Sequence, residues 1–334
     1  MASARGTLLE RALPLIGSLR RYRRQDLLAD LTAGGTVAVL LVPQAMGYAM
    51  LAGLPPTVGL YACTAPIIVY ALLGTSRQLA VGPVAVVSLL INAQVAPLAE
   101  GDPARYLSLA VEMALLVGVL QVAMGALRLG ALANFLSHAV TSGFTSAAAI
   151  IIVLSQLKNL LGIQMETEGS AFAQVVGAAH GLGGAQPVTL AMGLGTIVVL
   201  VALKRGLPRA PGPLLVATIG TALAASLRLD AHGLAVVGDV PRGFPRLALP
   251  PLQHDLLGAL LPAAITISLI GFVESIAIAG IVAARERYRV SANRELIALG
   301  AANLAAAAVG AYPVTGGLSR TAVNPQAGAR SGVA

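Results

Sequence analysis

Long apolar runs separated by short connections that carry charges, glycines and prolines dominate this chain. Most of the runs are long enough for a helix to cross the roughly 30 Å hydrocarbon core of a bilayer. The two longest connections, residues 163–186 and 229–255, are expected to be loops without a fold of their own. The pattern predicts an all-α polytopic membrane protein with spans at residues 27–50, 56–74, 83–98, 106–128, 133–162, 187–204, 211–228, 256–284 and 294–312, and a tenth span that begins at Ser319.

The third run, residues 83–98, is too short to cross a bilayer as a helix. From Pro83 to Pro97 a helix would extend only about 20 Å, so it has to begin part-way through the membrane. The preceding residues 78–82 show no helical face, and an extended backbone at this depth must be buried in protein or line a cavity. Because proline lacks the N–H that a helix start leaves unpaired, we expect Pro83 to be the first helical residue.

A second helix start of the same kind is expected after the glycine pair at residues 316–317. Ser319 would be its N-cap, Arg320 would add a full charge to the positive end of the helix dipole, and residues 312–316 would be its extended lead-in. The two starts are seven spans apart, so the two half-helices would enter from opposite sides and their N-termini would meet as an anion site. The alternative is that both are ordinary helix starts at the membrane surface.

Composition supports the membrane class and gives the orientation. Hydrophobic residues make up 57% of the chain and charged residues 11%, which no soluble domain of this length needs. Basic clusters at residues 20–24, 204–209 and 285–294 all fall on one side when the spans are counted, so the positive-inside rule places the N-terminus in the cytoplasm. The net charge of +8 therefore reports topology, and the absence of tryptophan argues against a nucleic-acid surface.

The remaining polar chemistry is sparse. A single cysteine, Cys63, excludes an internal disulfide and is expected to be a small packing residue. No metal-ligand spacing and no pair of nucleophile and base is present, so we expect no metal, no cofactor and no enzyme activity. The histidines are scattered along the chain, at His138, His180, His232 and His254.

Two carboxylates lie within apolar spans, where such groups are rare and usually face a cavity or a partner. Glu274, near the middle of the span at 256–284, is the better functional candidate, as a proton-coupling or gating group beside a substrate. The alternative is a structural carboxyl bonded to a neighbouring backbone. Glu112, near the start of its span, is expected to have a structural or interfacial role.

Characteristic motifs occur along nearly the whole chain, at residues 43–56 (PQAMGYAMLAGLPP), 59–61 (GLY), 74–77 (GTSR), 81–86 (VGPVAV), 137–138 (SH), 143–147 (GFTSA), 271–275 (GFVES), 315–320 (TGGLSR) and 326–328 (QAG), with Asn324. They resemble the sulfate permease (SulP) family, which includes bacterial anion transporters and the animal proteins pendrin and prestin. The resemblance implies a seven-plus-seven inverted-repeat transporter fold with a core and a gate domain, transport by an elevator-like movement, a homodimer, and a place in the bacterial inner membrane.

In that fold the chain divides into an N-terminal segment (1–26), a first repeat with spans one to seven (27–228), an extracytoplasmic loop (229–255) and an incomplete second repeat (256–334). The chain is expected to stop within the tenth span, before the STAS domain that usually follows in this family.

Carried over by position, the resemblance implies an anion site formed by the backbone at both helix starts and lined from the first span, with the residues Pro83, Val84, Ala85, Leu318, Ser319, Arg320, Gln44 and Tyr48. The spacing of Gln44 and Tyr48 agrees independently, because residues i and i+4 share a helix face. The alternative is that Gln44 bonds to a neighbouring helix and Tyr48 anchors an interface.

The expected function is secondary transport of a small anion such as sulfate, bicarbonate, chloride or a dicarboxylate like fumarate, with protons or sodium as coupling ions. Four alternatives remain open at this point: a nucleobase permease of the same architecture, an anion channel, a non-transporting scaffold, and a voltage-responsive motor. A nucleobase permease generally has acidic residues on its half-helices, where this chain has Ser319 and Arg320. A channel would carry large currents without a coupled counter-flux, whereas a scaffold or motor would show complex formation or charge movement without flux.

Overall fold

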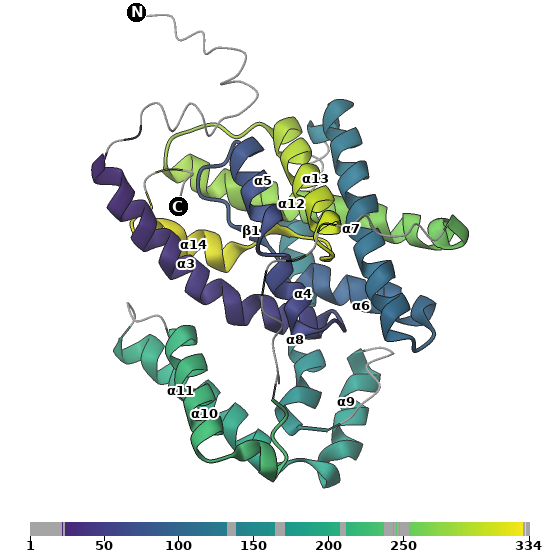
Figure 1. Cartoon of the computed structure of the whole chain (residues 1–334), viewed down its shortest axis with the longest axis vertical. Coiled ribbons are helices and arrows are strands. Elements are labelled where there is room, and N and C mark those ends of the chain that lie inside the picture. Colours follow the sequence, from purple (N-terminus) through teal and green to yellow (C-terminus); the bar gives the residue numbers. More distant parts are fainter. Residues whose placement is uncertain are drawn as a thin grey trace, which may run out of the picture. The chain divides into compact units, whose positions relative to one another are not determined.

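A computed structural model describes residues 22, 24–131, 138–163, 171–207, 212–236, 243, 245, 247, 254–329 and 331. The chain forms two compact units, Ser142–Pro241 and a larger unit of Met1–Thr141 with Arg242–Ala334. The larger unit contains α3 (Arg24–Leu51), α4 (Pro56–Tyr61), α5 (Ala65–Leu73), β1 (Val81–Gly82), α6 (Ala85–Ala99), α7 (Pro103–Ala126), a 3₁₀ turn η4 (His254–Leu256), α12 (Leu257–Arg285), α13 (Ala292–Ala308), β2 (Thr315–Gly316) and α14 (Leu318–Gln326) (Figure 1).

The smaller unit is helical throughout its described residues. It contains most of α8 (His138–Leu161), followed by α9 (Ala171–Gly181), α10 (Pro187–Gly206) and α11 (Gly212–Ser226), with short 3₁₀ turns at η2 (Leu182–Gly184) and η3 (Leu229–His232). Helices α10 and α11 pack against each other. Because α10 buries none of its residues, its apolar surface is free to face lipid or other protein.

Five helical segments among the described residues are long and apolar enough to cross a membrane. They are Asp26–Leu51, Pro56–Leu73, Pro103–Ala126, Pro187–Gly206 and Leu257–Arg285, with mean hydropathies from 1.5 to 2.2. All five coincide with predicted spans. Helix α6 is shorter, with 15 residues, as the sequence predicts for the third span.

Two predictions need correction, and one predicted span is interrupted. The second span is interrupted, because α4 ends at Tyr61 and α5 begins at Ala65 with Pro66 in its first turn. The connection at 163–186 was expected to be a loop, but it contains α9. Helix α13 ends at Ala308 and not near residue 312, since Gly310 adopts a positive φ of 69° and the following residues are extended. The N-terminal segment before residue 22 and most of 237–253 lie outside the described residues.

Glycines allow α7 and α13 to approach each other closely. A Cβ atom on Gly118 would lie 2.8 Å from the backbone nitrogen of Leu304, and one on Gly300 would lie 2.7 Å from that of Val122. Real Cβ contacts are not this short, so any larger residue would force the helices apart. Helices α7 and α13 thus form a closely packed pair, and α5 packs on α13. We call these three helices the α7–α13 frame.

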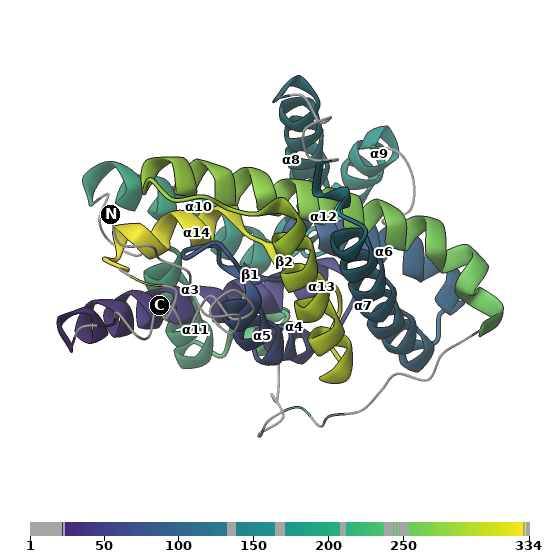
Figure 2. The same cartoon turned by 90° about the horizontal axis from the view of Figure 1, so that it is seen from above.

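The two predicted lead-ins pair with each other. Strands β1 and β2 form an antiparallel ladder in which Val81 lies opposite Gly316 and Gly82 opposite Thr315. The Gly317 N–H donates to the Ala80 carbonyl at 2.9 Å and extends the pairing by one residue. Helices α6 and α14 lead away from this ladder on opposite sides (Figures 1 and 2). The sequence predicts both extended segments, and the structure adds that each satisfies the backbone of the other.

Candidate functional site

The start of α6 leaves backbone donors free. Val84 is the N-cap, with φ −136° and ψ 151°, and no side chain caps the helix. The first intrahelical bond runs from the Ser88 N–H to the Val84 carbonyl at 3.0 Å, so the N–H groups of residues 85–87 precede it. The prediction that Pro83 is the first helical residue is wrong. Because Gly82 is still paired in the ladder, Pro83 continues the extended lead-in and α6 begins at Ala85.

The start of α14 has the same character. The Thr321 N–H donates to the Gly317 carbonyl at 3.0 Å, which leaves the N–H groups of residues 318–320 as the first turn. The prediction that Ser319 is the N-cap is therefore wrong, because the helix begins at Leu318 and Ser319 is its second residue. Leu318 and Ser319 are exposed, whereas Arg320 turns inward.

Arg320 lies where the two helix starts meet. Its side chain is only 2% exposed, and Nη1 donates to the Pro83 carbonyl of the other lead-in at 2.8 Å. Two glycines make room for the guanidinium, since a Cβ atom on Gly317 would lie 2.7 Å from Nη2 and one on Gly82 would lie 3.3 Å from it. The buried nitrogens Nε and Nη2 have no hydrogen-bond partner among the residues that the structure describes. A buried cation with two unused donors is costly, so the arrangement favours an anionic ligand.

Other polar side chains surround this guanidinium within electrostatic range, namely Tyr48, Cys63, Glu274 and Tyr312. The Tyr312 hydroxyl is fully buried and lies 3.2 Å from Ser88 Oγ on the first turns of α6. Cys63, expected to be only a packing residue, lies in the break between α4 and α5. Tyr312 was recognised only as part of a lead-in, because nothing in the sequence indicates that its ring turns toward α6.

Glu274 occupies the middle of α12 and is partly buried. Its Oε2 is shielded from solvent and has no hydrogen-bond partner within the described ranges of the chain. The backbone bond that a purely structural role would require is thus not present at this oxygen. The neighbouring Ser275 is the structural residue instead, because it accepts a hydrogen bond from the Gly316 N–H at 2.9 Å and contacts Thr315 Oγ1 at 2.6 Å.

Gln44 and Tyr48 lie on α3, which continues through Pro43 and packs against α14. Gln44 Oε1 is buried and finds no hydrogen-bond partner in the part of the chain that the structure describes, so the alternative of a polar bond to a neighbouring helix has no support at that atom. Tyr48 is within electrostatic range of Arg320. The structure therefore brings Tyr48 together with the helix starts and leaves Gln44 with an unused acceptor on the same helix.

The other polar candidates lie elsewhere. Glu112 is fully buried within α7, so the interfacial alternative for this residue is wrong. No group of three or more His, Cys, Asp or Glu side chains that could bind a metal occurs among the described residues. His180 and His232 lie at the ends of α9 and η3, in the smaller unit.

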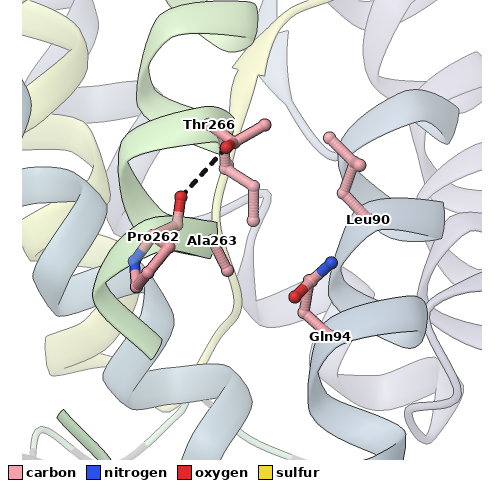
Figure 3. Close-up of a pocket in the computed structure, with 6 residues that line it drawn as sticks. Leu90, Gln94, Pro262, Ala263 and Thr266 are labelled. Carbon is pink, nitrogen blue, oxygen red and sulfur yellow. Dashed lines mark hydrogen bonds between the residues drawn. The ribbon is translucent and has the colours of Figure 1, made fainter. Parts of the chain in front are cut away.

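A cavity of about 160 Å³ lies between α6 and α12 and is lined by Leu90, Gln94, Pro262, Ala263, Thr266 and Ile267. Leu90 and Gln94 project from α6 toward Pro262 and Thr266, and the Thr266 hydroxyl donates to the Pro262 carbonyl (Figure 3). The lining includes no charged group. This cavity therefore lacks the features that would hold an anion, which are found at the helix starts.

Two half-helices thus begin at a shared antiparallel ladder, with a buried arginine between them. The chain belongs to the sulfate permease family, whose family model matches residues 27–334. The resemblance seen in the sequence is thus confirmed. The relatives reported below are transporters and not enzymes, as expected.

Among curated proteins, the chain is 40% identical over 323 residues to a probable sulfate transporter of Mycobacterium tuberculosis, strain CDC 1551, and 40% identical over 334 residues to the chloroplastic sulfate transporter 4.1 of Arabidopsis thaliana. The alignments cover 95% and 97% of this chain but 57% and 48% of the two relatives. The chain therefore spans about half the length of the curated relatives it matches.

Among solved structures, the chain is similar to the murine Slc26a9 anion transporter in the inward-facing state, with a TM-score of 0.91, 26% identity, and coverage of 99% of this chain and 58% of that one. It is also similar to the transmembrane domain of the cyanobacterial bicarbonate transporter BicA, with a TM-score of 0.82, 26% identity, and coverage of 93% and 80%. The predicted all-α inverted-repeat fold is confirmed by these neighbours, and the chain is a multi-pass membrane protein.

Proposed function

We propose that this protein is a secondary transporter of small anions and that the anion binds between the starts of α6 and α14. The observation that carries the proposal is Arg320, which is 2% exposed and bonds to Pro83 through one guanidinium nitrogen. Its other two buried nitrogens have no hydrogen-bond partner in the described part of the chain. The substrate class follows as sulfate, bicarbonate, chloride or a dicarboxylate such as fumarate, because a guanidinium and backbone donors serve any of these anions.

The proposed site combines charge with backbone donors. The N–H groups after Val84 and after Gly317 supply partial positive charge from two helix dipoles, and Arg320 supplies a full charge. The residues of this site are Pro83, Val84, Ala85, Leu318, Ser319 and Arg320, with Gln44 and Tyr48 lining it from α3. Because the β1–β2 ladder joins both helix starts, the proposed elevator movement would carry them together as one body.

Glu274 is the proposed coupling group. This proposal is supported by its Oε2, which has no hydrogen-bond partner among the described residues, and by its electrostatic interaction with Arg320. Neutralising this carboxylate removes a competitor for the guanidinium, so proton uptake would favour anion binding. Proton-coupled symport is therefore the transport mode that we propose, in a bacterial inner membrane with a cytoplasmic N-terminus and a homodimeric assembly.

The test is an uptake panel with radiolabelled sulfate, bicarbonate, chloride and fumarate into liposomes that contain the purified protein, with and without a pH gradient. We expect saturable uptake of at least one anion, stimulated by an acidic exterior and reduced in Arg320→Ala. Large currents without coupled counter-flux would identify a channel instead. Charge movement or complex formation without flux would identify a motor or a scaffold and would reject the proposal.

A further inference from the structure

The segment between α5 and β1, residues 74–80, has no regular secondary structure, yet it determines where β1 begins. Residues 75–78 of this segment depend on side chains from elsewhere in the fold. Those partners come from α13 and from the connection that precedes it.

Glu295, in the first turn of α13, is the main partner of this segment. The side chain is fully buried, and its Oε1 accepts hydrogen bonds from the Thr75 N–H at 2.6 Å, the Ser76 N–H at 3.0 Å and the Thr75 hydroxyl. Its Oε2 accepts a bond from the Tyr70 hydroxyl of α5 at 2.6 Å. Four donors, together with the positive end of the α13 dipole, satisfy a buried carboxylate that has no cation partner in an ion pair among the described residues.

Tyr288 holds the next residues of the same segment. Its hydroxyl lies 3.1 Å from Ser76 Oγ, accepts from the Arg77 N–H at 3.3 Å and donates to Gln78 Oε1 at 2.9 Å. The Arg77 guanidinium stacks over its ring at 5.3 Å. In addition, the Ser291 N–H donates to Thr75 Oγ1 at 3.1 Å. Residues 75–78 are thus held by Glu295, Tyr288 and Ser291. We name this set of contacts the lead-in clamp.

The clamp is connected to the anion site through few residues. Directly after it, the Ala80 N–H donates to Thr321 Oγ1 of α14 at 3.0 Å, and the Ala80 carbonyl accepts from Gly317. The ladder follows at Val81, and Pro83 then bonds to Arg320. A shift of Thr75 and Ser76 would therefore change the position of the α6 start relative to the α14 start.

We propose that Glu295 is a positioning residue for anion binding, which acts through Thr75 and Ser76 to hold the first helix start against Arg320. This inference rests on the proposed function, since it needs an anion at that site. Glu295 itself does not touch the anion. If the carboxylate were only a structural group, its loss would lower stability without a specific effect on anion affinity.

The test compares variants that affect the hydrogen bonds to one or the other carboxylate oxygen of Glu295. Glu295→Gln replaces the carboxylate that accepts three bonds from Thr75 and Ser76. Thr75→Val removes one of these three donors, the hydroxyl, with little change in side-chain volume. Tyr70→Phe is the matched control, because it removes a bond of similar length to the same carboxylate but none to the lead-in. Thr75→Ser keeps the hydroxyl and is the conservative rescue.

The readouts are the KM and maximal rate of radiolabelled sulfate and bicarbonate uptake in liposomes, and the midpoint of thermal unfolding. We expect Glu295→Gln and Thr75→Val to raise KM about five- to tenfold, as expected for a weakened hydrogen bond to a charged group. Tyr70→Phe and Thr75→Ser should keep the KM of the unmodified protein, even where Tyr70→Phe lowers the unfolding temperature. If Glu295→Gln does not fold, Thr75→Val against Thr75→Ser decides the question alone.

Equal KM values in Thr75→Val, Thr75→Ser and Tyr70→Phe would overturn the positioning role while leaving the proposed function intact, provided that Arg320→Ala still raises KM. If the unmodified protein shows no saturable uptake of either anion, the proposed function fails and this inference fails with it. Combining Thr75→Val with Arg320→Ala gives a further check. Because the clamp acts on the position of Arg320 relative to α6, the two effects on KM should be less than additive.

Discussion

Asn303 pairs with Val314 as a neighbouring strand would. Its Oδ1 accepts a hydrogen bond from the Val314 N–H at 2.7 Å, and its Nδ2 donates to the Val314 carbonyl at 3.0 Å. The same amide also bonds to Gln121 Oε1 of α7 at 3.0 Å. One side chain of α13 thus satisfies both backbone groups of the residue that leads into β2.

Asn303→Leu should destabilise the protein by about 2–4 kcal/mol, because it leaves a buried backbone N–H and carbonyl without partners. The shape of the side chain is nearly retained, so lost packing is a minor part of the effect. Thermal unfolding in detergent measures the change. Asn159→Leu, on an exposed position of α8, is the control and should be close to neutral. Equal stabilities of the two variants would contradict the role assigned to Asn303.

Gly59→Ala should be strongly destabilising. A Cβ atom at this position would lie 2.0 Å from the Ala45 carbonyl oxygen, so α4 would have to move away from α3. The expected cost is about 2 kcal/mol or more. Gly47→Ala in α3 is the control, because a Cβ atom there meets nothing within 4 Å and alanine is a better helix former than glycine. Chemical unfolding of the two variants should give shifts of opposite sign.

Arg320→Ala should weaken anion binding by about 1–3 kcal/mol, since a charge-assisted contact is lost while the backbone donors of two helix starts remain. Arg285→Ala, at an exposed arginine of α12, should leave affinity unchanged. Titration calorimetry with sulfate and bicarbonate measures both. Unchanged affinity in Arg320→Ala would place this residue outside the site.

Proline substitutions test the backbone donors one at a time. Ala85→Pro removes a single N–H at the first position of α6, and the preceding Val84 is already extended, as a residue before proline prefers. We expect anion affinity to fall by about 1 kcal/mol with little loss of stability, whereas Ala85→Gly keeps the donor and the affinity. At the other helix start, Ser319→Pro should reduce affinity more than Ser319→Ala. Retained affinity in both proline variants would exclude a site led by the backbone.

Glu274→Gln should separate binding from coupling. A neutral glutamine mimics the protonated carboxyl permanently, so anion binding should persist while uptake driven by a pH gradient falls sharply. A structural carboxyl would give a less stable protein whose folded molecules keep their pH-driven uptake. Measuring unfolding temperature, anion binding and gradient-driven uptake on one preparation distinguishes the two outcomes. Full coupled uptake by a stable Glu274→Gln protein would exclude the coupling role.

The sequence was sufficient to predict the extended lead-ins and the short helices after them. Their signals are local: a run too short to span, glycines where a chain approaches closely, and prolines where an N–H is dispensable. Both helix starts were misplaced. The start at Pro83 was placed too early, because the pairing of Gly82 with Thr315 keeps the chain extended past Pro83. The start at Ser319 was placed too late, because α14 already begins at Leu318. That pairing joins distant segments, and no local pattern encodes it.

The residues that hold the lead-ins were largely missed for the same reason. Glu295 is the fourth residue of α13 and follows a basic cluster. From the sequence alone it is therefore indistinguishable from an exposed acidic residue in the first turn of a helix. Asn303 and Ser275 lie within apolar runs, and a small polar residue there often bonds only within its own helix. The sequence offers one signal: a polar residue inside a membrane costs free energy unless it is hydrogen-bonded, so such a residue is expected to have a bonding partner.

The contact between Pro83 and Arg320 joins residues that are 237 positions apart in the chain. During synthesis the first lead-in is made long before its partner strand. Until β2 is present, the N–H and carbonyl groups of this lead-in either lack ladder hydrogen bonds or bond to water or to another protein. Non-local pairing of this kind is slow to form. The proposed anion site can consequently form only after β2 has been made, and the α7–α13 frame cannot shorten that delay, because α13 is itself made only shortly before β2.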